Sequence, residues 1–173
     1  MRCFIAIDIP EALKPRIIGL QEQFSGYNTK LVESQNLHFT LKFLGETDLV
    51  GLEDRLEFIS RTPSFEIELA GMGCFPSENF VRSIWIGIRH NQKLINLQES
   101  VSKALGLGEE VFTPHLTIAR LRSQKHKNGI IDIIKNNSGI EIGTMKLTCV
   151  KLKESKLSPE GPAYRDVRTF GMI

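Results

Sequence analysis

The sequence predicts an α+β fold built on two antiparallel β-sheets. Helical and strand-like segments alternate along the 173 residues, and most strand-like segments alternate apolar with polar side chains. That alternation is typical of antiparallel sheets with one covered face, because strands buried on both faces are apolar throughout. A His-x-Thr tripeptide occurs in each half of the chain, at residues 38–40 and 115–117, within a similar order of segments. We therefore expect residues 1–173 to form a single domain of two pseudo-symmetric lobes, with one motif in each lobe facing a central cleft.

The first part of the chain predicts strand, helix, strand and helix in turn. Residues 3–9 are mostly β-branched or aromatic and predict a buried strand. After Pro10, apolar residues recur at helical spacing over residues 13–24. The strand that carries the first motif ends at Gly45, and residues 49–59 return to helical spacing.

The middle of the chain predicts a hairpin and a third helix. Residues 65–69 alternate apolar and acidic side chains, residues 81–88 form another strand-like run, and Phe75-Pro76-Ser77 lies in the expected loop between them. Residues 94–105 show helical spacing that ends at Gly106. The strand with the second motif follows a short acidic link.

The C-terminal part predicts one more helix and further strands. Residues 124–135 form a weaker helical pattern, and the alternation over residues 140–152 predicts one long strand. Residues 155–164 are rich in turn-forming residues, and residues 167–170 predict an edge strand. No long linker or low-complexity segment divides the chain.

The composition is that of an ordinary globular protein, with 41% hydrophobic and 24% charged residues. A net charge of +2 is too small to indicate duplex binding, so any contact with nucleic acid is expected to be local. The widely spaced Cys3, Cys74 and Cys149 predict reduced core thiols. No apolar run approaches the length of an export signal or a membrane span. We expect a cytoplasmic monomer without a membrane partner.

The two His-x-Thr motifs carry the chemistry that the sequence predicts. Alternation along a strand places His38 and Thr40 on one face, and His115 and Thr117 likewise. An isolated strand histidine is often only structural, and threonine is a good strand former, but the duplication among only four histidines favours a paired function. Two imidazoles and two hydroxyls facing each other are suited to acid/base catalysis at a phosphoryl group.

The motifs and their flanks resemble a known family. The segments are RCFIAIDIP, HFTLKFLGE, GMGCFPS with RSIWIGI, FTPHLTIAR and SKLSPEGPAYRDV. Together they resemble the two-histidine phosphoesterase superfamily, specifically the RNA 2′,3′-cyclic phosphodiesterases once called 2′-5′ RNA ligases. The resemblance implies a bilobal fold with helices packed outside the two sheets, and hydrolysis of RNA 2′,3′-cyclic phosphate ends to a 2′-phosphomonoester. It also implies that the reaction needs no metal or cofactor; the RNA could include tRNA fragments.

The resemblance also assigns roles to residues. It implies that His38 is the proton donor and His115 the proton acceptor, although the sequence alone does not distinguish them. Thr40 and Thr117 would bind the phosphate oxygens. Arg120 occupies a position where the family usually has an arginine, and its guanidinium could bind phosphate through two hydrogen bonds.

Strand counting disagrees with the family pattern at Arg120. Counted from His115, Arg120 falls on the opposite face of the strand and reaches the cleft only if the strand ends or twists there. Lys42 is in phase with His38 and is expected near the cleft rim. Candidates for stacking on an RNA base are Phe4, Phe75, Phe80 and Tyr164.

Three other functions fit parts of the sequence. The same cleft could join RNA halves through a 2′-5′ bond, or bind RNA ends without catalysis. A metal hydrolase would combine the histidines with acids such as Glu46, Asp48, Glu109 or Glu110, but closely spaced His/Asp/Glu clusters are lacking. Gly71-Met72-Gly73 lacks the spacing of a phosphate-binding loop, which disfavours a kinase or an ATP-dependent ligase.

Overall fold

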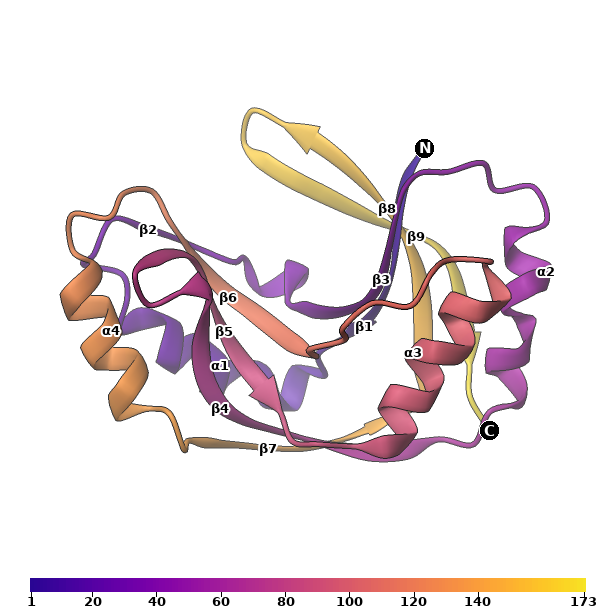
Figure 1. Cartoon of the computed structure of the whole chain (residues 1–173), viewed down its shortest axis with the longest axis horizontal. Coiled ribbons are helices and arrows are strands. Elements are labelled where there is room, and N and C mark those ends of the chain that lie inside the picture. The colour runs from indigo at the N-terminus through magenta and orange to yellow at the C-terminus, as the bar shows by residue number, and fades with distance from the viewer.

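All strands belong to one antiparallel sheet that bends into two halves (Figure 1). The computed structural model describes residues 1–173. The strand order is β7-β4-β5-β6-β3-β1-β8-β9, and β2 lies beside β6. One half consists of β1 (Arg2–Asp8), β3 (His38–Glu46), β8 (Cys149–Ser158) and β9 (Gly161–Gly171). The other half consists of β2 (Thr29–Leu31), β4 (Phe65–Ser77), β5 (Phe80–Ile88), β6 (His115–Leu121) and β7 (Glu141–Leu147).

The two halves meet where β3 and β6 lie side by side. These strands share a single pair, Phe39 with Leu116, and both side chains are fully buried. Because each motif surrounds one member of this pair, the junction brings the two motifs to the same place. The predicted α+β class with antiparallel strands is confirmed, and the two expected sheets are joined into one at this pair.

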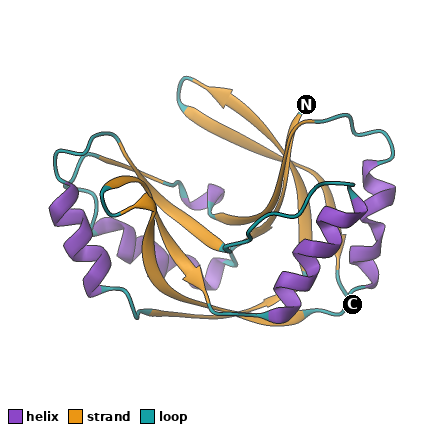
Figure 2. Cartoon of the chain, in the orientation of Figure 1, coloured by secondary structure: helices purple, strands orange, loops and turns teal.

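The helices lie on the outside of the sheet (Figure 2). Helix α1 (Lys14–Glu22) follows β1 in the chain but packs against β6, and α3 (Gln92–Ala104) follows β5 but packs against β3. The outer face of each half is therefore covered by a helix that follows, in the sequence, a strand of the other half. A continuous core of 36 buried residues includes side chains from both halves.

The remaining helical segments agree with the predicted regions. The pattern over residues 49–59 corresponds to α2 (Leu52–Leu56) followed by a 3-10 turn, η3 (Glu57–Arg61). The last helix, α4 (Lys127–Asn136), begins a few residues later than predicted. Two further 3-10 turns, η1 (Glu11–Leu13) and η2 (Ser34–Asn36), precede α1 and β3.

A β-bulge follows the His-x-Thr motif on both central strands. The pairing of β3 with β1 passes from Thr40 to Lys42, and Leu41 and Lys42 are both buried. The pairing of β6 with β5 likewise passes from Thr117 to Ala119, and both Ile118 and Ala119 are buried. One extra residue reverses the alternation of side chains beyond it. The next residue on each strand therefore returns to the face that carries the histidine.

Three predictions for single segments are wrong. The expected strand over residues 140–152 is two strands, because the chain leaves β7 at one edge of the sheet and enters β8 in the other half. Both pieces alternate, so the periodicity does not reveal the change of position. The turn-rich segment 155–164 forms the end of the long β8–β9 hairpin, with Ser158 paired to Gly161. The expected loop at residues 75–77 is the end of β4.

The three cysteines are free thiols, of which only Cys3 is fully buried. Burial raises the pKa of the Cys3 thiol. None of the helices combines the length and apolar character needed to cross a membrane.

Candidate active site

A cleft of about 700 Å³ lies between the two halves of the sheet. Its lining includes all five residues that the sequence predicts for the site, namely His38, Thr40, His115, Thr117 and Arg120. Strands β3 and β6 supply them because the two motifs flank the single pair that joins these strands. The structure thus brings the predicted residues together.

The two histidines are held in the same way. Nδ1 of His38 lies 2.7 Å from the carbonyl oxygen of Asn36, and Nδ1 of His115 lies 2.7 Å from the carbonyl oxygen of Thr113. A carbonyl only accepts hydrogen bonds, so both Nδ1 atoms must donate. Each neutral ring therefore carries its proton on Nδ1 and keeps Nε2 available to accept or deliver a proton.

Aromatic rings confine each imidazole. The centroids of Phe4 and Tyr164 both lie 5.1 Å from that of His38. Those of Phe75 and Trp85 lie 4.8 Å and 6.4 Å from that of His115. Three of the four predicted stacking candidates therefore contact the histidines directly. The fourth, Phe80, is absent from the cleft and lies beneath the guanidinium of Arg82.

The electrostatic surroundings of His38 favour its neutral form. Burial is the main cause of the lowered pKa of His38, and the nearby positive charges of Lys153 and Arg120 also lower it. The hydrogen bond to Asn36 and the charge of Asp8 oppose this decrease. The balance of these effects favours the neutral imidazole of His38 in the free protein.

A network of four charges lies on β1, β8 and β9 beside His38, since Asp8 is the cross-strand neighbour of His38. Lys153 contacts Asp8 at 3.0 Å and Asp166 at 2.6 Å, and Lys151 contacts the same two carboxylates at 2.8 and 2.6 Å. Burial would raise the pKa of Asp166, but hydrogen bonds from Lys151 and Lys153 outweigh it and lower that pKa. The two lysines and two aspartates of the network have no net charge, and Asp8 is paired with both lysines.

The β-bulges explain where the residues beyond each motif lie. On β6 the bulge returns Arg120 to the cleft, so the expectation from simple strand counting is wrong and the family pattern agrees with the geometry. On β3 the bulge turns Lys42 away from the cleft, where it is buried and pairs with Glu110 at 2.9 Å. The expectation that Lys42 lies at the cleft rim is therefore also wrong.

Sequence reasoning missed Phe43, which occupies on β3 the position that Arg120 occupies on β6. Phe43 lines the cleft with 73% of its surface exposed, which is unusual for a phenyl ring. An unbroken alternation places it on the buried face, so only recognition of the bulge could have identified it.

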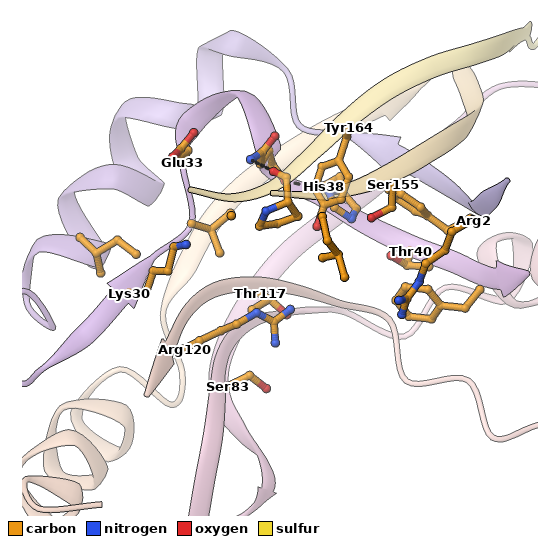
Figure 3. A pocket seen from close by; sticks show the side chains of 18 of the residues that line it. Arg2, Lys30, Glu33, His38, Thr40, Ser83, Thr117, Arg120, Ser155 and Tyr164 are labelled. Carbon is orange, nitrogen blue, oxygen red and sulfur yellow. Dashed lines mark hydrogen bonds between the residues drawn. The ribbon is translucent and has the colours of Figure 1, made fainter. Parts of the chain in front are cut away.

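Positive side chains line both ends of the cleft. Figure 3 shows Arg2 beside Ser155 at one end, and Lys30 and Glu33 at the other, with His38 between them. Arg2, Lys30 and Arg120 form no salt bridge with any carboxylate, whereas most other cations near the cleft are paired. Their charge is therefore available to an anion.

Comparison with known proteins identifies the family. The family described as LigT like Phosphoesterase matches residues 7–85 and 86–164, which is nearly the whole chain. The chain belongs to this family. The resemblance of the motifs and their flanks to the two-histidine phosphoesterase superfamily is thereby confirmed.

Relatives of this LigT-like chain include RNA 2′,3′-cyclic phosphodiesterase of Methanocaldococcus jannaschii, which is 39% identical over 98% of this chain and 100% of the relative. The crystal structure of Escherichia coli LigT complexed with 3′-AMP has 26% identity and a TM-score of 0.75 over 99% of this chain and 96% of that chain. A Thermus thermophilus protein, with 24% identity over 99% of this chain and 97% of that chain, shares the fold at a TM-score of 0.82.

The acids considered for a metal site lie elsewhere in this LigT-like phosphoesterase. Glu46 and Asp48 line a separate shallow depression next to Met1, and Glu110 pairs with Lys42. No three His, Cys, Asp or Glu side chains are gathered closely enough to hold a metal ion.

Proposed function

We propose that this protein hydrolyses the 2′,3′-cyclic phosphate at RNA ends to a 2′-phosphomonoester, without a metal ion. The observation that carries the proposal is the pair of histidines, each fixed through Nδ1 to a carbonyl oxygen 2.7 Å away and each lining the same cleft. The relative from M. jannaschii, whose name is RNA 2′,3′-cyclic phosphodiesterase, supports the choice of substrate. RNA ends are therefore the proposed partner.

The reaction requires one group to remove a proton and another to supply one. Water attacks phosphorus on the side opposite the 3′ oxygen, Nε2 of His115 accepts the proton of that water, and the bond from phosphorus to O3′ breaks. Nε2 of His38 gives its proton to O3′, which leaves a 3′ hydroxyl and a 2′-phosphate. The family resemblance supports this assignment of the two histidines.

Because burial lowers the pKa of His38, we expect the proposed donor to gain its proton when substrate is present. A cyclic phosphodiester carries a negative charge, and an opposite charge a few ångströms away favours imidazolium. Substrate binding is therefore expected to favour protonation of His38. A bell-shaped dependence of rate on pH follows, because one histidine must be protonated and the other neutral.

Three side chains in the cleft can stabilise the phosphoryl group during this reaction. The hydroxyls of Thr40 and Thr117 can donate to the non-bridging oxygens, and the unpaired guanidinium of Arg120 can donate two hydrogen bonds. The exposed phenyl ring of Phe43 offers a surface on which the terminal base can stack. The site thus has groups for the cyclic phosphate and for the terminal base.

The test is hydrolysis of a short RNA ending in a 2′,3′-cyclic phosphate, with EDTA present. We expect His38→Ala and His115→Ala each to slow the reaction by about 10²- to 10⁴-fold. His90→Ala is the matched control, because His90 is exposed and does not line the cleft. Undiminished rates in both cleft variants would show that the mechanism is wrong. Linked product from added 5′-hydroxyl RNA would instead establish joining, and binding without turnover would establish a silent RNA-end binder.

We also propose that the chain is one domain of two related lobes. The same family description matches residues 7–85 and 86–164, and each segment holds one His-x-Thr motif followed by a bulge. The expectation of a cytoplasmic monomer stays a prediction, which fractionation and sedimentation would test.

A further inference from the structure

The cleft extends beyond the histidines in two directions, and its two ends differ in chemistry. At the end formed by β1 and β3, the lining includes the exposed ring of Phe43 and the side chain of Arg2. At the end formed by β2 and the tip of the β8–β9 hairpin, it includes Lys30, Glu33 and Gly161 (Figure 3). The proposed reaction uses Phe43 but leaves the Lys30 end without a role.

A ribose 2′,3′-cyclic phosphate likewise has two chemically different sides. The base is attached to C1′, next to C2′, whereas the 5′ oxygen leaves through C4′, next to C3′. The base and the 5′ side of the nucleotide therefore extend from the cyclic phosphate in opposite directions. If the base stacks on Phe43, the 5′-phosphate of the terminal nucleotide points toward Lys30.

Lys30 is placed to meet that phosphate. It is the cross-strand partner of Arg120, so one strand spacing separates it from the arginine beside the second motif. Adjacent strands lie about 4.8 Å apart, so Lys30 and Arg120 are near neighbours, and both line the cleft. The ammonium group forms no salt bridge, and its protein partner is the carbonyl oxygen of Glu160 at 3.3 Å.

The ammonium group of Lys30 lies next to the tip of the β8–β9 hairpin. Gly161 has a φ of +128°, and a Cβ on it would lie 2.8 Å from Nζ of Lys30. The positive φ favours glycine at this position, and the absence of a Cβ leaves space for the end of the lysine side chain beside the hairpin. The carboxylates of Glu33 and Glu160 line the same end but do not pair with Lys30, so they weaken the local positive potential without neutralising it by contact.

We propose that Lys30 forms a second phosphate subsite, which binds the phosphate on the 5′ side of the terminal nucleotide and so favours RNA ends over cyclic mononucleotides. This inference rests on the proposed function for the position of the substrate. It gives a binding function to the end of the cleft that the catalytic residues do not occupy. Glu33 opposes this binding through its charge.

The test measures binding, so it does not depend on turnover. The probes are adenosine 2′-monophosphate and adenosine 2′,5′-bisphosphate, which differ only in the 5′-phosphate, titrated into the full chain by calorimetry at fixed salt. We expect the parent protein to bind the bisphosphate about 5- to 20-fold more tightly, as one charge-assisted contact in a solvated site allows. In Lys30→Met this ratio should fall to about one, while the affinity for the monophosphate stays within about twofold.

Two further variants sharpen the result. Lys125→Met removes an exposed lysine that does not line the cleft, and it should leave the ratio unchanged. Glu33→Gln removes an opposing charge, and it should increase the ratio. A parent protein that binds both probes equally, or a Lys30→Met variant that keeps the ratio, would overturn the subsite. Failure of the proposed hydrolysis would appear separately, as intact cyclic-phosphate RNA in the activity assay.

Discussion

Lys153 offers a quantitative test of the charge network beside His38. Its side chain is only 8% exposed, and its ammonium group bridges Asp8 at 3.0 Å and Asp166 at 2.6 Å. Lys153→Met keeps most of the aliphatic volume and removes the charge, so it isolates the electrostatic contribution. The variant leaves two carboxylates that share Lys151 alone.

The expected loss follows from the exposure of the partners. Removing one member of a fully buried ion pair costs about 3–5 kcal/mol. Here Asp8 and Asp166 are 36% and 41% exposed, so water screens and solvates the carboxylates that remain. We therefore expect the free energy of unfolding to fall by about 1–2 kcal/mol, which corresponds to roughly 2–8 °C in Tm for a chain of this size.

The loss should depend on pH in a defined direction. The network lowers the pKa of Asp166, so its contribution to stability is fully present above the ordinary pKa of an aspartate and is lost as pH falls through the lowered value. The difference between parent and variant should therefore be complete at neutral pH and shrink as pH falls below about 4.

Urea denaturation at pH 7 and at acidic pH measures this difference, and an unchanged slope with denaturant would show that only stability has changed. The control is Lys156→Met, because Lys156 is 70% exposed and lies 3.9 Å from its partner Glu154. Its effect should stay within about 0.5 kcal/mol. If Lys153→Met costs no more than Lys156→Met at pH 7, or costs the same amount at every pH, the network does not stabilise the protein as argued.

Three further predictions concern the site. Lys153→Met should raise the pKa of His38 and Asp8→Asn should lower it, because the two charges act in opposite directions; NMR titration of the four histidines in the free protein checks this, and shifts of the same sign would contradict it. Phe43→Ala should reduce kcat/KM on RNA by about 5- to 100-fold with little change in Tm, whereas Phe43→Trp should retain most of the rate, and equal losses in both would argue against stacking. Arg120→Ala should reduce kcat by about 10²- to 10³-fold, and Arg120→Lys should recover little of it because an ammonium group lacks the planar two-donor geometry; full recovery would point to charge alone.

Much of the candidate site could be predicted because it depends on short-range periodicity. His38 and Thr40, and the matching pair on β6, are two residues apart on strands, so alternation alone places each pair on one face. The helices and most strands also follow from local patterns of apolar residues. These features require no knowledge of which strands are neighbours.

The failed predictions for residues of the site depend on long-range pairing. A β-bulge is defined by a partner strand, so the altered positions of Lys42, Phe43 and Arg120 are invisible to counting along one strand. The change from β7 to β8 is equally hidden, because strands at opposite sides of the sheet can show the same alternation. In this protein, resemblance to a family predicted the position of Arg120 in the cleft correctly, because an arginine recurs at this position in the family.

The two histidines have different neighbours although the motif is repeated. Both histidines bond a carbonyl oxygen through Nδ1, so the motif itself makes them equivalent. Their surroundings are not equivalent, since His38 lies beside the lysine and aspartate network whereas His115 lies beside the indole of Trp85. Charged neighbours change the balance between imidazole and imidazolium. Any difference in pH dependence between the proposed donor and the proposed acceptor is therefore expected to arise from the strands around the motifs, and exchanging those neighbours should change the dependence of rate on pH.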